Sequence, residues 1–432
     1  MTDLIKTIKD AGVAGMGGAG FPSYLKADSK VEIIIANGAE CEPLMWSDYY
    51  AMSEYAGDLM EGLNLLKKHT GAQRMIIAVK AKKKHLVEKL ESALKYGIEI
   101  FLLEDYYPAG DEIILVNDVL GITVPERTFP VKNGVLVNNA ATIINIGRAF
   151  KGYPVTKRFV TVTGEVNRPF AAEVPLGISF SDLLKTAGGS SLTEFSIMES
   201  GVMMGRLADV NDVVCKTTSG IVVLPPEHPV VRERKSDIER HYKIARSVCD
   251  QCYACSEVCP RLLIGHRIEP HKIMRSVAFP QAGTASDSAN CCLCGLCSLF
   301  ACPMGISPRR VIENIRINAG VNPGMGNAKP ADPMINLKRI PMSRLLYRLG
   351  LEKYERNNVT FLKDFPAPES VRLMLRQHRG EPAVPVVKKG EIIKVGEVAA
   401  KAYDGRPSLP VHCSITGAVS AVNADFIEIS IR

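Results

Sequence analysis

At residues 249–260 the sequence is Cys-Asp-Gln-Cys-Tyr-Ala-Cys-Ser-Glu-Val-Cys-Pro, and at residues 291–303 it is Cys-Cys-Leu-Cys-Gly-Leu-Cys-Ser-Leu-Phe-Ala-Cys-Pro. Each run contains a triplet of cysteines at two-residue gaps and then a cysteine that precedes a proline. Two-residue gaps let one tight loop bind three corners of an iron–sulfur cubane, whereas the fourth corner must be reached from elsewhere in the chain. The runs therefore predict two [4Fe–4S] clusters.

The predicted ligand sets cross between the two runs. The first cluster is assigned to Cys249, Cys252, Cys255 and Cys302, and the second to Cys291, Cys294, Cys297 and Cys259. Cys292 leaves an alternative open, because it could replace Cys291 as a ligand or be a buried neighbour. Zinc is the rival interpretation, since Cys-x2-Cys pairs also bind zinc. Two triplets, each followed by Cys-Pro, are better explained by cubanes.

The remaining cysteines, Cys41, Cys215 and Cys413, stand alone among the 12 of the chain, and we expect ordinary thiols there. Residues 1–10 are too polar for a secretory signal peptide and are predicted to form the first helix of a domain, with a short amphipathic targeting helix as the alternative. Clustered cysteines in such a chain indicate metal ligands in a reducing compartment rather than disulfides. We therefore expect a cytoplasmic protein, or one enclosed in a cytoplasmic body.

The composition is that of an ordinary globular protein, and its 432 residues are enough for about two to four domains. The formal charge of +7 is mild for this length and does not indicate nucleic-acid binding. No run of ~18 apolar residues occurs, so no membrane-spanning helix is expected. The densest basic run, at Lys80, Lys82, Lys83 and Lys84, is predicted to be a solvated loop or helix start.

Strands alternate with helices in the first third of the chain. Short apolar runs predict strands at residues 32–36, 75–79, 99–103 and 135–138, with helices at 49–68, 86–95 and 140–150. This alternation predicts a mostly parallel, Rossmann-like sheet with helical crossovers. After residue 154 the pattern changes to an alternating strand at 158–166 and a helix at 177–187, which is typical of a small β-grasp unit.

A glycine-rich loop, Gly15-x-Gly17-Gly18-x-Gly20-Phe21-Pro22, precedes the first predicted strand, and Lys26 follows it. Alone, the loop is consistent with a phosphate-binding loop or with a plain turn. Three further segments accompany it: Asn37-Gly-Ala-Glu40-Cys-Glu-Pro, Tyr107-Pro-x-Gly110-x-Glu112 and Asn138-Asn139-Ala-Ala-Thr142. Together they resemble the flavin-binding 51-kDa subunit of NADH:quinone oxidoreductase and, more closely, the RnfC family of electron-transport proteins.

The resemblance implies an FMN site formed by these segments. The implied contacts are Gly15, Gly17, Gly18, Gly20, Phe21, Lys26, Asn37, Glu40, Tyr107, Gly110, Glu112, Asn138, Asn139 and Thr142. In the 51-kDa subunit, aromatic residues after the Gly-Phe-Pro segment help to hold NADH. Here only Phe21 and Tyr24 are nearby, so the resemblance supports FMN better than it supports NADH.

The resemblance extends over nearly the whole chain and implies its domain order. Residues 158–187 resemble the SLBB β-grasp domain, and residues 375–390 resemble the opening of RnfC proteins, whose barrel-sandwich domain stands here near the C-terminus. This permuted order is similar to that of the cobalamin reductases of propanediol-utilisation microcompartments. The predicted architecture is α/β with small domains: an FMN/NADH domain at 1–152, an SLBB domain at 153–232, a helical two-cluster ferredoxin-like domain at 233–318, a linker at 319–372 and a barrel-sandwich domain at 373–432. Lys401 lacks the surroundings of a biotinyl or lipoyl lysine.

The resemblance implies an oxidoreductase that takes electrons from NADH. FMN accepts two electrons together and releases them singly to the clusters. The implied acceptor is cob(III)alamin or cob(II)alamin, with a corrinoid adenosyltransferase and a microcompartment shell as expected partners. The alternative is an RnfC-like relay between protein partners without corrinoid chemistry. No acid–base or nucleophilic catalytic residue is predicted, and His266 and His271, which flank the cysteine runs, are expected to be structural or exposed.

Overall fold

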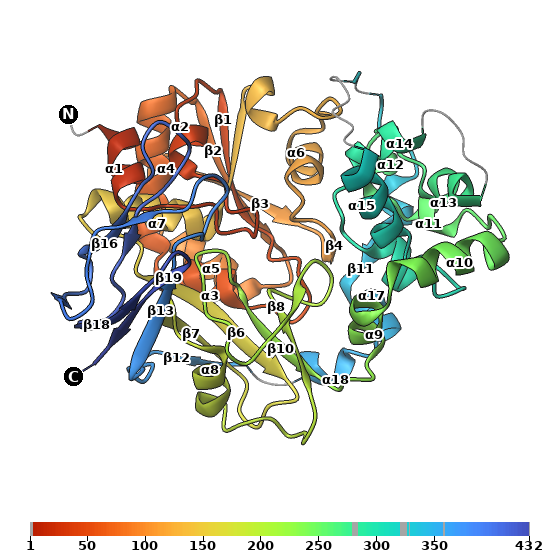
Figure 1. Ribbon diagram of the computed structural model, residues 1–432. Helices are drawn as coiled ribbons and strands as arrows, with labels where there is room; N and C mark the ends of the chain where they lie inside the picture. The colour runs from red at the N-terminus through yellow and green to blue at the C-terminus, as the bar shows by residue number, and fades with distance from the viewer. Residues whose placement is uncertain (1–2, 279–283, 320–325, 328, 357–358, 432) are drawn as a thin grey trace.

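The structure is a computed structural model that describes residues 3–278, 284–319, 326–327, 329–356 and 359–431 (Figure 1). Its first region has the elements α1 Leu4–Asp10, α2 Ser23–Ala27, β1 Ile33–Gly38, α3 Ser47–Glu54, α4 Ala56–Thr70, β2 Arg74–Lys80, α5 Lys84–Ser92, β3 Glu99–Leu103, β4 Tyr106–Tyr107, α6 Glu112–Leu120, η1 Pro130–Asn133, β5 Val135–Asn139 and α7 Ala140–Phe150. The four longer strands form a parallel sheet in the order β3-β2-β1-β5, which confirms the predicted Rossmann-like sheet.

Alternate residues of β1 pack on opposite faces of this sheet. Ile34 belongs to the core shared with α4 and α7, whereas Ile35 belongs to the core shared with α6. A strand that is buried on both faces needs an unbroken apolar run, and such a run is the pattern that predicts this strand. Helices α4 and α7 touch backbone to backbone, because a Cβ on Gly62 would lie 2.2 Å from the carbonyl oxygen of Ile143.

The helix predicted at residues 49–68 is two helices. Tyr55 separates α3 from α4 with a φ of −120° and a ψ of 38°, outside the helical region. Its hydroxyl donates to Glu173 Oε2 at 2.9 Å, and its ring packs edge-on against Phe159. The chain therefore leaves the helical conformation at a residue that contacts the neighbouring domain, and the helical propensity of tyrosine does not predict this break.

The β-grasp region contains β6 Lys157–Gly164, β7 Phe170–Pro175, α8 Phe180–Thr186, β8 Ser196–Glu199, β9 Arg206–Ala208 and β10 Gly220–Leu224. Its sheet has the order β12-β7-β6-β10-β8-β9, and its first strand, β12 Thr360–Leu362, comes from the segment predicted as a linker. That segment also contains α16 Ile335–Lys338, β11 Ile340–Pro341, α17 Met342–Leu349 and α18 Glu352–Glu355. β11 pairs with β4 of the first region, so this part of the chain packs into its neighbours and is not a free linker.

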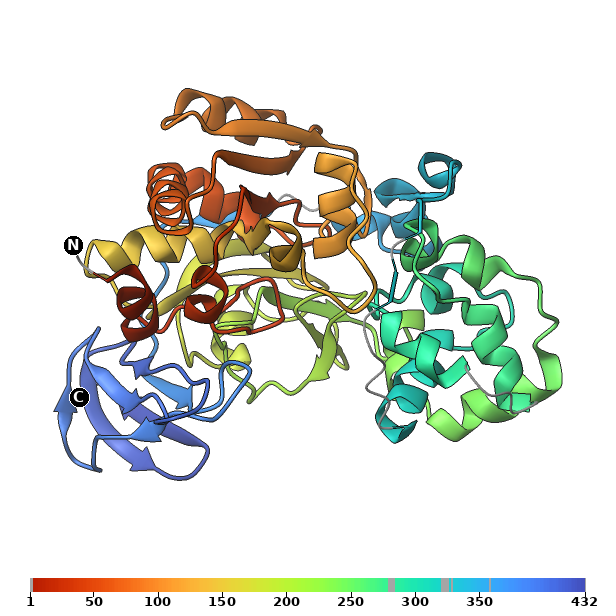
Figure 2. The same ribbon diagram turned by 90° about the horizontal axis from the view of Figure 1, so that it is seen from above.

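The cysteine-rich region is helical, as predicted, and lies at one end of the molecule (green in Figure 2). It contains α9 Pro229–Lys235, α10 Ile238–Val248, α11 Ala254–Glu257, α12 Pro260–Leu263, α13 Pro270–Ala278, α14 Thr284–Asp287, η2 Ser288–Asn290, η3 Leu296–Ala301 and α15 Pro308–Ala319. Within the described ranges, no helix is both long enough and apolar enough to cross a membrane.

The C-terminal region lies at the opposite end and consists of two small antiparallel sheets (blue in Figures 1 and 2). Its strands are β13 Ser370–Met374, β14 Val384–Pro385, β15 Ile392–Ile393, β16 Val398–Lys401, β17 Val411–His412, β18 Gly417–Val422 and β19 Phe426–Ser430. It packs beside α1: the buried Lys216 Nζ donates to Gly12 O at 2.7 Å and to Pro410 O at 2.9 Å. Arg379 N donates to Gly20 O at 2.8 Å, so this domain also contacts the glycine loop.

Candidate flavin and iron–sulfur site

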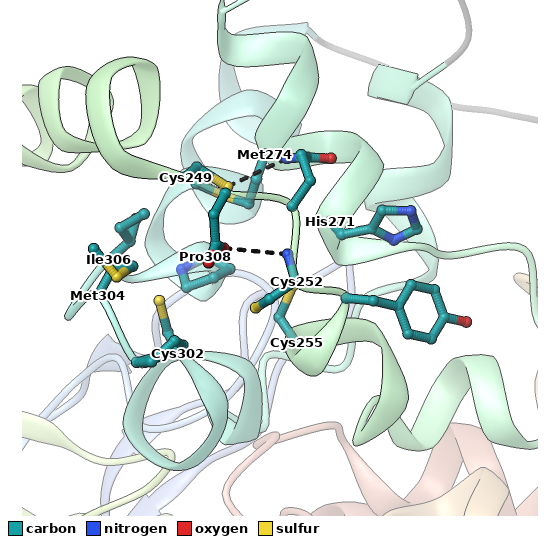
Figure 3. Close-up of a pocket in the computed structure, with 13 residues that line it drawn as sticks. Cys249, Cys252, Cys255, His271, Met274, Cys302, Met304, Ile306 and Pro308 are labelled. Carbon is teal, nitrogen blue, oxygen red and sulfur yellow. Dashed lines mark hydrogen bonds between the residues drawn. The ribbon is translucent and has the colours of Figure 1, made fainter.

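Four cysteines line one pocket and point into it (Figure 3). They are Cys249 at the end of α10, Cys252 in the loop that follows, Cys255 in α11, and Cys302 at the end of η3. The loop of the first run bends tightly, because Gln251 has a φ of 59° and Tyr253 a φ of 70°. Cys302, from the second run, ends η3. The structure thus brings together the four cysteines of the first predicted set, including the one that comes from the opposite run.

The electrostatics of this first set favour a cationic occupant. Burial, followed by the neighbouring Cys302, Cys252 and Cys249, raises the pKa of Cys255 to about 12. Four thiolates in one pocket repel one another unless positive charge lies between them. Four sulfur donors, contributed by the two cysteine runs and gathered at one pocket, match the all-thiolate ligand set of a cubane.

The second set gathers around Cys259. Burial raises the pKa of Cys259 to about 12, and the nearby Cys292 contributes to this rise. Burial raises the pKa of Cys297 well above its usual value, with further contributions from Cys291 and Cys259. Cys294 shares a side-chain hydrogen bond with Cys292. Five thiols therefore lie together here, and Cys292 is a close neighbour of the predicted ligands.

The segments of the predicted flavin site also meet. Asn37 and Asn139 are register partners at the carboxyl ends of β1 and β5, which are adjacent in the sheet. Asn37 Nδ2 donates to Gly110 O at 2.9 Å, and Thr142 Oγ1 accepts from Met16 N at 2.9 Å. The glycine loop, the ends of β1 and β5 and residues 107–112 therefore lie together. We call this region the flavin locality, and residues 107–112 the flavin segment. In open α/β sheets, ligands bind at such carboxyl ends.

Several features of this locality fit a polar, planar group such as FMN. Gly18 has a φ of 92°, and a Cβ built there would meet nothing within 4 Å, which leaves its backbone open. Asn138 Nδ2 and Asp48 Oδ1 are buried and have no hydrogen-bond partner among the described residues. Buried polar atoms are normally satisfied, so these two are available to a ligand. The residues present thus fit the group that the resemblance implies.

Charged side chains surround this locality. Glu40 lies at the N-terminus of α3 and accepts from Asp48 N at 2.7 Å and from Tyr49 N at 3.0 Å. Burial, together with the charge of Asp48, raises the pKa of Glu40 to about 7. Lys26 Nζ lies 2.8 Å from Glu112 Oε1, so these two predicted contacts pair with each other. The side chain of Phe21 is 44% exposed.

Helix α5 begins at Lys84, which confirms the predicted helix start, but the basic run is not solvated throughout, which corrects the rest of the prediction. Lys80 is buried and pairs with Asp105 Oδ1 at 2.8 Å. Lys83 Nζ lies 3.0 Å from the centroid of the Trp46 ring, and burial lowers its pKa to about 8. Its charge acts on Glu40, so Lys83 belongs to the flavin locality. Nothing in the spacing of the lysines distinguished Lys83 from its exposed neighbours.

Two contacts join the flavin locality to the second cysteine set. The buried Tyr107, predicted to contact FMN, donates its hydroxyl to Cys294 O at 2.8 Å. Arg261 Nη2 donates to Asp111 Oδ2 at 2.8 Å. Both histidines make a hydrogen-bond contact: His266 Nε2 lies 2.8 Å from Val124 O, and His271 Nδ1 lies 2.8 Å from Ser256 Oγ. His271 also lines the pocket of the first set, and a structural role for the two histidines stays a prediction.

Family models match four parts of the chain. They are the Nuo51 FMN-binding domain at residues 8–148, the SLBB domain at 159–207, the 4Fe-4S dicluster domain at 248–307 and the RnfC barrel sandwich hybrid domain at 350–429. These matches confirm the predicted fold class and support FMN and iron–sulfur cofactors. The last match starts earlier than predicted and includes part of the segment 319–372.

Relatives of known activity match over almost the whole chain. The Cobalamin reductase PduS of Salmonella typhimurium is 38% identical over 434 residues, which cover 99% of this chain and 96% of the relative. That of Citrobacter freundii is 38% identical over 429 residues, with 98% and 95% covered. The chain belongs to the PduS cobalamin reductase family. As a PduS-type protein it is an oxidoreductase, as predicted.

More distant similarities support the same architecture. A component of the Na(+)-translocating ferredoxin:NAD(+) oxidoreductase complex of Acetobacterium woodii is 34% identical over 265 residues, or 59% of this chain and 57% of the relative. The crystal structure of an NAD+-reducing [NiFe]-hydrogenase in the H2-reduced state superposes with a TM-score of 0.50 at 18% identity, covering 74% of the PduS-type chain and 62% of the other. This last similarity concerns the fold alone.

Proposed function

We propose that the chain takes electrons from NADH at FMN and passes them through two [4Fe–4S] clusters to cob(III)alamin or cob(II)alamin. FMN supplies the conversion from paired to single electrons. The observation that carries the proposal is the junction between the two localities, where Tyr107 and Arg261 join the flavin segment to the second cysteine set. These two hydrogen bonds would hold FMN and the second cluster close to each other.

The protein's own residues would hold these groups. FMN would lie against the glycine loop and the ends of β1 and β5, with the unpartnered Asn138 amide as a donor. The first cluster would bind Cys249, Cys252, Cys255 and Cys302, and the second Cys259, Cys291, Cys294 and Cys297, with Cys292 as a neighbour rather than a ligand. We assign no acid–base role, because electron relay between such groups requires none.

The order of transfer follows from burial. Cys294 and Cys297 are buried, and the carbonyl of Cys294 contacts Tyr107, whereas Cys252 is exposed at the surface. The charge of Cys255, in the first set, acts on Cys297, in the second, so the two sets are neighbours. Electrons would therefore pass from the flavin to the second set, then to the first set, and then to the acceptor.

The acceptor is inferred from the activity in the names of the Salmonella and Citrobacter relatives. The corrinoid would meet the exposed edge of the first set, beside Cys252 and Tyr253, where a bound adenosyltransferase could receive the product. A cytoplasmic location inside a bacterial microcompartment is part of the same proposal.

A spectroscopic experiment tests the proposal. Anaerobically purified protein should contain FMN, iron and acid-labile sulfide for two cubanes, and NADH should bleach its visible iron–sulfur band. Adding cob(III)alamin should then restore the band and yield reduced corrinoid. If NADH leaves the spectrum of fully loaded protein unchanged, the relay alternative, which the Acetobacterium relative supports, replaces the NADH-dependent reductase. Stoichiometric zinc with little iron or sulfide would refute both.

A further inference from the structure

Arg261 links the two redox localities and is not a predicted ligand of either. It follows Cys259-Pro260 in the first turn of α12 and reaches Asp111 of the flavin segment, with the two side chains only 12% and 14% exposed. Asp111 is itself anchored, because its Oδ1 accepts from Ile113 N at 3.0 Å and Ile114 N at 3.2 Å at the start of α6. The guanidinium is therefore held in place from the flavin side.

The other side of the guanidinium faces the second cysteine set. Asp111 and the nearby Cys292 thiol raise the pKa of Arg261, and the charge of Arg261 acts to lower the pKa values of Cys259 and Cys291, so the guanidinium lies beside these thiols. Its Nε is buried and has no partner among the described residues. A guanidinium stays protonated at any physiological pH, so a permanent cation with a spare donor lies among these thiols.

The pocket of the first cysteine set differs in its fixed charge. The described residues that line this pocket include Asp250 but no lysine or arginine. Its Cys252 is exposed, so solvent screens the charges there. The two runs thus share a triplet of cysteines at two-residue gaps, but among the described residues a buried cation is held beside the thiols of the second set and none lines the pocket of the first.

We propose that Arg261, held by Asp111, is a positioning residue that raises the reduction potential of the cluster bound by Cys259, Cys291, Cys294 and Cys297. This inference rests on the proposed function, because it requires a cluster at the second set. One electron enters such a cluster and no bond breaks, so the net negative charge of the cluster and its thiolates increases by one. A nearby cation stabilises the reduced form, and a hydrogen bond to a cluster sulfur acts in the same direction. The first electron transfer from the flavin therefore becomes more favourable.

Potentiometric titration of both clusters, followed by EPR on the intact chain, tests the inference. Arg261→Gln should make the second cluster harder to reduce, by a tenfold or greater change in its reduction equilibrium, equivalent to about 59 mV for one electron. Arg261→Lys keeps the charge and should recover much of the shift. Arg246→Gln is the control, because Arg246 donates to Val277 O and lies in the last turn of α10, which ends just before Cys249 of the first set.

Asp111→Asn gives the decisive comparison. Asparagine can still cap α6, but it removes the counter-charge of Arg261, so the potential of the second cluster should rise, opposite to the effect of Arg261→Gln. A merely structural role would make both variants lose iron or shift in the same direction. The inference is overturned if iron-replete Arg261→Gln keeps the potential of the parent chain. If Arg261→Gln fails to hold the cluster, Asp111→Asn decides: a raised potential supports the inference, and an unchanged or lowered one overturns it. The iron content of the parent chain and its response to NADH test the proposed function separately.

Discussion

The two cysteine sets are built from nearly the same sequence pattern, yet their surroundings differ. The first set opens to the surface beside Tyr253, which is 43% exposed. In the second set Cys259, Cys294 and Cys297 are buried and Cys291 is partly exposed, and Tyr107 and Arg261 connect this set to the flavin segment, residues 107–112. The cysteine motif therefore indicates which cofactor is bound. The packing around the motif determines which other group lies close enough to exchange electrons with that cofactor. Under the proposed function, the packing pairs the second set with the flavin and the first set with the acceptor.

The largest expected effect comes from removing one cluster at a time. Cys297→Ser should abolish bleaching of the remaining iron–sulfur band by NADH, because the link from the flavin is lost. Cys252→Ser should keep NADH-dependent bleaching of the second cluster but abolish reduction of the acceptor. Stopped-flow absorbance of iron-quantified protein measures both steps. Equal loss of bleaching in the two variants would break the proposed order of the sets.

The second prediction concerns the buried carboxyl of Glu40 in the flavin locality. Because burial and Asp48 raise its pKa to about 7 in the folded state, the folded protein holds a proton that the unfolded chain releases near its ordinary pKa of 4.5. Stability should therefore fall as the pH rises from about 4.5 to about 7, by up to roughly 3 kcal/mol for this group. In flavin-free protein, Glu40→Gln should flatten that slope in urea unfolding at pH 5 and pH 8. Exposed Glu88→Gln is the control, and an unchanged slope in Glu40→Gln would contradict the assignment.

A smaller effect is expected at the junction itself. Tyr107→Phe removes the hydroxyl that bonds Cys294 O and leaves that carbonyl without its donor. We expect the free energy of unfolding to fall by about 1–2 kcal/mol, and electron transfer from the flavin to slow. Tyr153→Phe, at a side chain that is 59% exposed, should change neither quantity. Equal effects in the two variants would show that the hydrogen bond does not join the localities.

The smallest expected effect concerns the C-terminal domain. Arg379 Nε donates to Ala19 O at 3.1 Å, next to the backbone bond from Arg379 N to Gly20 O. Arg379→Ala removes the first bond only, so FMN should bind several-fold more weakly, for a loss of about 1 kcal/mol. Flavin fluorescence titration measures this, with exposed Lys388→Ala as the control. Unchanged affinity would mean that the domain touches the glycine loop without ordering it.

Sequence patterns succeeded where the interaction is local. The strands of the parallel sheet, the helical cysteine region and the domain order follow from apolar runs and short motifs, which act over a few residues. They failed where a distant partner decides. The predicted helix is interrupted at Tyr55, whose hydroxyl contacts Glu173 of the neighbouring domain, and β12 joins a sheet from a segment predicted to be a linker. Lys83 belongs to the flavin locality because the fold brings its charge close to Glu40, which is distant in the sequence.

By itself, the sequence determined the kind of chemistry: two cysteine runs whose spacing suits cubanes, and a set of loops that resembles a flavin site. Spacing along a chain limits which side chains can share one small ligand, so this information is local. Only the tertiary structure decided which cysteine set faces the flavin segment, that Arg261 lies between them and that Cys252 faces solvent. Burial and fixed charge are properties of packed surfaces, and residues far apart in the sequence create those surfaces together.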